Sequence, residues 1–256
     1  MENLKLIDCT KKKLDNTYII MYAIKNELNM KKGETIENID VYTLIGINKK
    51  GIRQLVGIYQ DKPQNSRHWL DIFGALKSRG LQTILFLTVD DNKNFKRTVK
   101  MTFPMITFVD SLTYIVPKFY KYTTEKSTKD VYARISRLFT EPTLNDYKAE
   151  MDDFKSEYNN TIHQKLIEKY LKNVEICYKY SYNIRALLFK TSANFNIYER
   201  IRLSFNSNES YINDISELYS RLESADRVMG FTSYTKSQWT HILNDLMQLY
   251  PDIEFI

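Results

Sequence analysis

Two consecutive aspartates, Asp90 and Asp91, are the residues of this sequence whose type and position best suit chemistry. They directly follow the run from Ile84 to Val89, which is almost unbroken in its apolar character and typical of a buried strand. Ligands of α/β enzymes bind beyond the carboxyl ends of such strands, where a carboxylate can hold a metal ion. Asp90 is therefore a candidate ligand for one cation, although an aspartate that only caps the strand end is the simpler interpretation. Asp91 is better placed to stabilise the start of a following helix.

A cationic surface is the second candidate site. Lysine and arginine recur after Asp91 at intervals of three and four residues, which places them on one face of a helix. They could contact DNA phosphates, and arginines near residue 200 could extend the surface, although a solvated helix face would show the same pattern. The net charge of +6 and the isoelectric point of about 9.0 agree with DNA as a partner but also reflect a lysine-rich composition. The candidate DNA-binding residues are Lys93, Lys96, Arg97, Lys100, Arg200 and Arg202.

The histidines and cysteines do not indicate a second metal centre. His68 precedes Trp69 in a predicted helix and is interpreted as structural, and His163 and His241 lack neighbouring ligands at metal-binding spacing. The two cysteines are far apart, which favours a reducing compartment. No apolar run approaches the roughly 20 residues of a membrane span, and the first residues lack the apolar segment of a signal peptide. We therefore expect a cytoplasmic protein without membrane contact.

The secondary-structure elements that must position these residues change from predicted strands to predicted helices along the chain. Strand-like runs dominate up to about residue 115, and two of them form a hairpin whose turn, Asn48 to Gly51, suits a left-handed glycine. Gly80 closes a first helix, and helical periodicity prevails beyond residue 115. The predicted strands are 17–25, the two arms of the hairpin within 40–60, 83–89 and 106–109, and helices are predicted to begin near residues 65 and 93.

This order, β-β-β-α-β-α-β followed by helices, predicts an α/β fold with a ribonuclease-H-like mixed sheet, a helical insertion and a helical C-terminal part. A generic α+β domain is the alternative. We assign residues 1–115 to the ribonuclease-H-like core, 116–182 to the helical insertion and 183–256 to C-terminal helices that complete the core. A hydrophobic content of 43% is sufficient for a core of this size.

Several segments together resemble the catalytic region of the mutator-type (MULE-like) transposases of bacterial insertion sequences. The similarity is strongest from Val41 to Pro104, weakens through 138–143 and 180–191, and extends faintly to Trp239. An N-terminal DNA-recognition region of the kind found in these transposases is not expected here. The segments that carry the resemblance are DVYTLIGINKKGIRQLVGI at 40–58, His68-Trp69-Leu70, Leu76 to Leu81, Asp90 and Phe103-Pro104.

The resemblance implies a ribonuclease-H-like fold whose DDE site cuts and joins DNA. Such a site uses three carboxylates to bind two divalent metal ions roughly 3.5–4 Å apart. The corresponding positions in this sequence are Tyr22, Asp90 and Phe195, so that only one carboxylate remains. Glu199, one helical turn after Phe195, is a possible displaced carboxylate. A neutral phenol cannot replace a carboxylate on Mg²⁺.

The substitutions predict a catalytically inactive, transposase-derived protein that is not an enzyme and that binds DNA or has a regulatory role in a mobile-element context. No cofactor is expected, or Mg²⁺ if activity remains. One alternative is a protein-interaction module without DNA binding, for example a homodimer built on exposed aromatic residues such as Tyr22 and Phe195. The other is a metal-dependent DNA nuclease or transposase with relocated carboxylates.

Overall fold

The computed structural model divides the chain into two compact units, each made of two separate segments. We call Met1–Val109 with Phe195–Tyr234 the sheet unit, and Asp110–Asn194 with Thr235–Ile256 the helical unit. The structure describes residues 12–61, 66–90, 92–112, 115–116, 119, 128–192, 211–223, 230–231 and 234–255.

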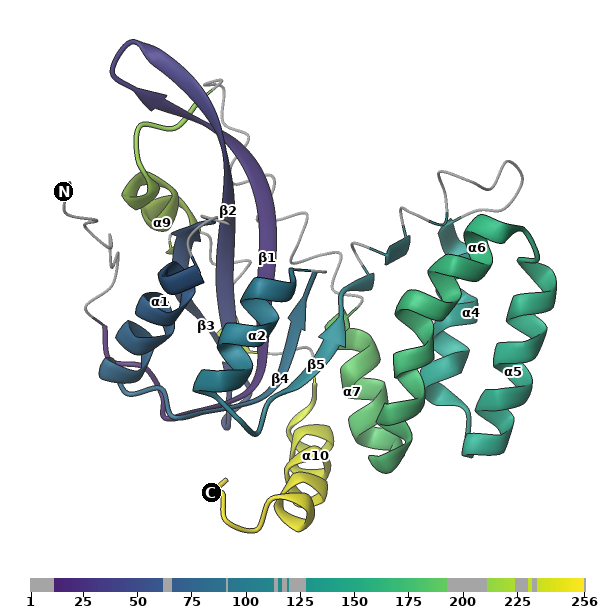
Figure 1. Ribbon diagram of the computed structural model, residues 1–256. Helices are drawn as coiled ribbons and strands as arrows, with labels where there is room; N and C mark the ends of the chain where they lie inside the picture. The colour runs from purple at the N-terminus through teal and green to yellow at the C-terminus, as the bar shows by residue number, and fades with distance from the viewer. Residues whose placement is uncertain are drawn as a thin grey trace. The chain divides into compact units, whose positions relative to one another are not determined.

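The sheet unit contains a mixed sheet with the strand order β5-β4-β1-β2-β3-β6 (Figure 1). The first three strands form an antiparallel meander, and β4 then pairs with β1 in parallel. The predicted element order β-β-β-α-β-α-β is therefore the order of the chain up to residue 110, and the mixed sheet is confirmed. The strands are β1 (Thr17–Lys32), β2 (Thr35–Asn48), β3 (Ile52–Gln60), β4 (Thr83–Val89), β5 (Thr107–Asp110) and β6 (Gly230–Phe231).

The turn between β2 and β3 is built by the residues that predicted it. The Asn48 side chain accepts hydrogen bonds from the backbone N–H groups of Lys50 and Ile52, at 3.0 and 2.9 Å. Gly51 has a φ of 75°, in the left-handed region that a residue without a Cβ occupies at low cost. Local side-chain chemistry thus fixes this hairpin, and the register of β2 and β3 follows from it.

The hairpin of β1 and β2 is longer than the sequence predicts. The strands pair as far as Lys32 with Thr35, and Gly33 turns the chain with a φ of 63°. Residues 31–38 are all exposed, so this end of the ribbon lacks the alternation of apolar and polar residues that identifies a half-buried strand. Its strand conformation results from the pairing of the two strands with each other.

Two helices, α1 (Ser66–Ser78) and α2 (Lys93–Thr102), pack on the same face of the sheet (Figure 1). Trp69 and Phe73 of α1 and Phe95 of α2 are buried there against Tyr42 and Leu44 of β2. Burial of large apolar side chains contributes roughly 1.5–3 kcal/mol each, so this aromatic cluster is a main source of stability for the unit.

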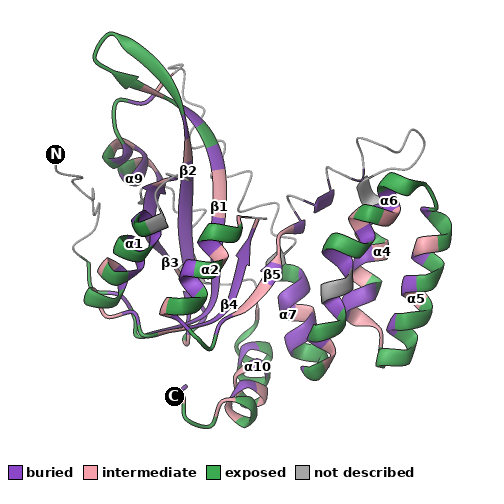
Figure 2. Ribbon diagram, viewed as in Figure 1, coloured by how far each residue is buried: buried purple, intermediate pink, exposed green. Residues whose placement is uncertain are grey.

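The helical unit is an assembly of short helices whose buried stripes face one another (Figure 2). Thr143 and Asp146 form a capping box, because each side chain accepts a hydrogen bond from the other residue's backbone N–H. A separate helix, α9 (Ile215–Glu223), belongs to the sheet unit. The elements of the helical unit are α4 (Thr128–Thr140), α5 (Leu144–Glu157), α6 (Thr161–Leu166), the π-helix η1 (Ile167–Leu171), the 3₁₀-helix η2 (Lys172–Lys179), α7 (Tyr182–Ser192) and α10 (Lys236–Leu249).

A buried arginine of α7 joins several segments of the helical unit. The Arg185 guanidinium donates hydrogen bonds to the carbonyl oxygens of Phe139, Tyr180 and Glu141 at 3.2, 3.0 and 2.8 Å. It also lies over the ring of Tyr178, with 4.4 Å between the guanidinium carbon and the ring centroid. Because Phe139 lies in the last turn of α4 and the last carbonyls of a helix have no partner within it, Arg185 satisfies groups that would otherwise be buried without a donor.

Candidate functional site

Asp90 lies directly after β4 and belongs to a chain of hydrogen bonds that crosses the end of the sheet. The Tyr42 hydroxyl donates to Asp90 Oδ1 at 2.8 Å. Asn92 Nδ2 donates to Tyr42 Oη at 3.2 Å and, more weakly, to Asp61 Oδ2 at 3.4 Å. The indole N–H of Trp69 donates to Asp61 Oδ1 at 3.2 Å. We call these five residues the Asp90 network.

Lys25 adds a positive charge beside the Asp90 network. Its ammonium group pairs with Asp40 at 2.8 Å, and both side chains are about one-third exposed, at 33% and 31%. The same charge acts on the carboxylates of Asp90 and Asp61. Asp40 within β2, Asp61 directly after β3 and Asp90 directly after β4 therefore lie in the field of the same lysine.

The pKa values of the two network carboxylates are raised. Burial is the main cause of the raised pKa of Asp90, and the hydrogen bond from Tyr42 and the charges of Lys25 and Lys96 oppose it. Burial also raises the pKa of Asp61, against the hydrogen bond from Trp69. Because the charged form is penalised in both cases, these carboxyl groups hold a proton more readily than they would in water.

The described residues do not fit a two-metal site. Such a site requires several carboxylate oxygens directed at a common point. Among the residues that the structure describes, no group of three Asp, Glu, His or Cys side chains is arranged to hold a metal ion. One oxygen of Asp90 is bound by Tyr42, and Lys25 supplies positive charge nearby. Asp91, Phe195 and Glu199 lie outside the described residues, and Asp90 as a single weak ligand stays a prediction.

Tyr22 is buried on the opposite face of the sheet from Tyr42. It pairs with Thr88 of β4, whereas its neighbours Met21 and Ala23 point into the core beneath α1 and α2. Asp90 binds Tyr42 on the α1 and α2 side, so its carboxylate is directed away from the face of Tyr22. Tyr22 is only 5% exposed, so the expectation that its side chain is exposed is wrong, whereas a homodimer stays a prediction.

The predicted cationic face lies on α2. Lys93, Arg97 and Lys100 are exposed, and Lys96 is half-buried beside Asp90. The other side of α2 packs into the core, so the cations share the solvent side of the helix. Lys100 also donates from Nζ to the Ile106 carbonyl at 2.8 Å. Their contact with DNA stays a prediction, and Arg200 and Arg202 lie outside the described residues.

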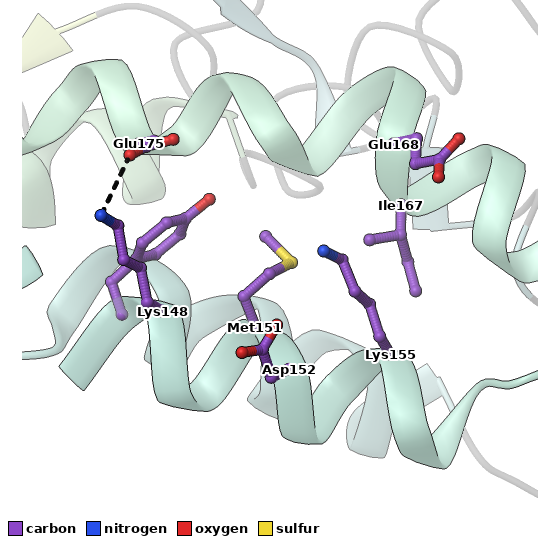
Figure 3. A pocket seen from close by; sticks show the side chains of 8 residues that line it. Lys148, Met151, Asp152, Lys155, Ile167, Glu168 and Glu175 are labelled. Carbon is purple, nitrogen blue, oxygen red and sulfur yellow. Dashed lines mark ion pairs between the residues drawn. The ribbon is translucent and has the colours of Figure 1, made fainter. Parts of the chain in front are cut away.

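A groove of about 490 Å³ in the helical unit offers a different kind of surface (Figure 3). It lies between α5 and the η1–η2 segment, with the buried side chains of Tyr147, Met151 and Ile167 among its lining. Lysines of α5 face glutamates on η1 and η2, and the Lys148 ammonium lies 3.9 Å from the Glu175 carboxylate. The mixed charges do not match a phosphate backbone, so the groove is not assigned to DNA.

Local sequence signals differ in strength among the members of the site. Asn92 could have been recognised as a helix cap, because it directly precedes the helical run and its side chain accepts from the Phe95 N–H. Tyr42 and Asp61 carry no local signal of their roles. His68 is buried, and its Nε2 lies 2.6 Å from the Gln60 carbonyl oxygen, which agrees with the predicted structural role.

Comparison with known proteins decides the family. Residues 5–216 match the family described as "Transposase, Mutator family". The chain belongs to this family. The match covers the sheet unit's first segment and most of the helical unit, and the resemblance to mutator-type insertion-sequence transposases is confirmed.

Curated relatives of this mutator-family chain carry transposase names. A probable transposase for an insertion sequence element from Corynebacterium diphtheriae is 18% identical over 94% of this chain and 77% of its own length. A probable transposase for an ISRM3-like element from Sinorhizobium fredii is 19% identical over 70% of this chain and 46% of its own length. The transposase of element IS1201 from Lactobacillus helveticus is 23% identical over 71% of this chain and 50% of its own length. The chain thus spans about half the length of the last two.

The family overturns one expectation from the sequence. We predicted from Tyr22 and Phe195 that the chain is not an enzyme, yet the family and the relatives are transposases, which are DNA-cutting enzymes. Substitution at two aligned positions is therefore not sufficient to exclude the mutator-family chain from this enzyme class. In the part of the chain that the structure describes, no helix combines the length and apolar character of a membrane span.

Proposed function

We propose that this mutator-family chain acts on DNA in the movement of an insertion sequence, and that the solvent side of α2 contacts the DNA backbone. The family and the transposase names of its relatives support action on DNA. The strand order β5-β4-β1-β2-β3, with α1 and α2 in the connections that lead to β4 and β5, supports a ribonuclease-H-like sheet as the scaffold.

The observation that carries the proposal is the one-sided charge of α2. Its first two turns present Lys93 and Arg97 to solvent, whereas Phe95 and Val99 anchor the helix in the core. Cations held on a rigid element lose little freedom on binding phosphate, and each neutralised phosphate releases counterions from DNA. The helix is therefore suited to contact the backbone without reading sequence.

DNA binding by purified protein tests this proposal. A fluorescently labelled duplex of about 30 base pairs is titrated by anisotropy at roughly 50–200 mM salt, because phosphate contacts make affinity fall steeply in this range. The double reversal Lys93→Glu with Arg97→Glu removes two phosphate contacts. We expect the slope of log affinity against log salt to flatten by about 1.8, with ~10- to 100-fold weaker binding.

The matched control reverses two exposed lysines of the helical unit, Lys148→Glu with Lys165→Glu. It changes the net charge equally but leaves α2 intact, so its affinity should stay much closer to that of the wild-type protein. Strand cleavage is measured in the same reactions with Mg²⁺ or Mn²⁺ added. If the wild-type protein shows no DNA binding at low salt, or if both double variants lose affinity equally, the assignment to α2 is wrong.

A further inference from the structure

The start of α2 is tied to the sheet by one carboxamide. Asn92 is the N-cap residue, and its Oδ1 accepts from the Phe95 N–H at 3.0 Å. Its Nδ2 donates to Tyr42 Oη at 3.2 Å and to Asp61 Oδ2 at 3.4 Å. The same side chain therefore ends the loop after β4, begins the helix and links both to β2 and β3.

Tyr42 is the residue of this link that is held in place by the core. Its side chain is fully buried, and its ring stacks on Phe95 at a centroid distance of 5.2 Å and meets Trp69 edge-on at the same distance. A phenol hydroxyl donates one hydrogen bond and can accept others. Tyr42 Oη uses both capacities, because it donates to Asp90 and accepts from Asn92.

We propose that Tyr42 is the positioning residue for the DNA-contacting side of α2, acting through Asn92 and Asp90. This inference rests on the proposed function. Through Asn92, the hydroxyl sets the point at which α2 begins and hence the direction of Lys93 and Arg97, which lie in the first two turns.

Through Asp90, the same hydroxyl also acts on the charge of the cationic side. Lys96 lies close enough to Asp90 for its charge to act on the carboxylate, and the hydrogen bond from Tyr42 holds Oδ1 toward the sheet. Without that bond the Asp90 carboxylate is no longer held toward the sheet, and its negative charge can move beside the start of α2. Loss of the Tyr42 hydroxyl therefore weakens the phosphate-binding surface in two ways, by loosening its start and by releasing a negative charge beside it.

The test removes the hydroxyl and keeps the ring, in Tyr42→Phe. A second variant, Asn92→Ser, keeps a capping oxygen but cannot bridge to Tyr42 and Asp61. The matched control is Tyr18→Phe, which removes another buried tyrosine hydroxyl of the same sheet, one that donates to Gln54 Oε1 at 2.7 Å. Tyr18 has no hydrogen bond to α2 among the described residues. DNA affinity and its salt slope are measured for the wild-type protein, the three single variants and the double variant Tyr42→Phe with Asn92→Ser, together with hydrogen exchange of the amides in the first turn of α2.

We expect Tyr42→Phe and Asn92→Ser to bind DNA about three- to tenfold more weakly, with a slope about one phosphate shallower and faster amide exchange at Phe95. The double variant should lose less than the sum of the two, because both changes break one link. Tyr18→Phe should change neither slope nor exchange in α2.

Equal behaviour of Tyr42→Phe and Tyr18→Phe in both measurements overturns the positioning role and leaves DNA binding by α2 in place. Absence of DNA binding by the wild-type protein overturns the proposed function and, with it, the role of Tyr42 in DNA contact. In that case hydrogen exchange at Phe95 still reports whether Tyr42 anchors the helix.

Discussion

Replacing Arg185 by methionine is expected to destabilise the helical unit strongly. Methionine fills a similar volume but donates no hydrogen bonds, so the carbonyl oxygens of Phe139, Tyr180 and Glu141 lose their charged donor inside the protein. Arg185 is only 5% exposed, and water cannot readily replace the guanidinium at this position. The change therefore leaves acceptors unsatisfied rather than exchanging them for solvent.

The magnitude follows from the geometry. Three of the contacts are 2.8–3.2 Å long, within the ordinary range for N–H···O bonds, and a fourth, to Pro142, is at the limit at 3.5 Å. A buried acceptor left without a donor costs about 1–3 kcal/mol. Relief of the desolvation of the buried guanidinium offsets part of this sum. We expect a net loss of roughly 3–5 kcal/mol in the free energy of unfolding.

Thermal and urea unfolding, followed by far-ultraviolet circular dichroism, measure this loss. The matched control is Arg137→Met, which removes an exposed arginine from α4 and should change stability by about 0.5 kcal/mol or less. Arg185→Lys should lie between the two, because an ammonium group can donate to some of the carbonyls but lacks the planar fork. A stability of Arg185→Met within about 0.5 kcal/mol of the Arg137→Met value would refute the reasoning.

Three further changes test other parts of the structure. A Cβ at Gly46 would lie 2.3 Å from the Tyr18 ring, so Gly46→Ala should lower the free energy of unfolding by about 1–3 kcal/mol. Gly74 lies in α1 with open space around it, so Gly74→Ala should raise the free energy of unfolding by up to about 1 kcal/mol. Urea unfolding compares the two variants. Arg134→Gln leaves three carboxylates of α5 without their shared partner and should lose about 1–3 kcal/mol in the same assay. A loss below about 0.5 kcal/mol, the usual effect of a surface substitution, would contradict the ion-pair geometry. Burial raises the pKa of Cys177 to about 11 from 9.0, so the unfolded state releases this proton first and stability falls as pH rises from 9 to 11. Relative to Cys177→Ala, the wild-type protein should lose roughly 2–3 kcal/mol across that window and nothing below it.

Local signals in the sequence predicted the turns and helix ends correctly. Asn48 and Gly51 act within a few residues of each other, and so do Thr143 and Asp146, so their geometry can be inferred without knowledge of the fold. The outer part of the hairpin between β1 and β2 could not be predicted, because its residues are exposed and its conformation depends on pairing. Periodicity also could not separate the α-, π- and 3₁₀-helical parts of residues 161–179.

The site was less predictable than the fold because its members come from distant segments. Asp90 was found by its position after a buried strand, but Tyr42, which binds it, lies 48 residues earlier and has the pattern of a core residue. Asp61 follows β3, and only the sheet order brings it near Asn92. The expectation of a non-enzyme failed for a related reason, since it depended on three aligned positions, whereas the family extends over residues 5–216.

The interleaving of the two units has a consequence for biosynthesis. The chain passes from the sheet unit to the helical unit, returns at Phe195, and leaves again at Thr235. A ribosome therefore releases most of the helical unit before the sheet unit is complete, and α10, whose Trp239, Ile242 and Leu246 are buried, leaves the exit tunnel only after the sheet unit. Neither unit can finish folding early, and a nascent chain arrested before α10 would expose apolar surface to chaperones and proteases.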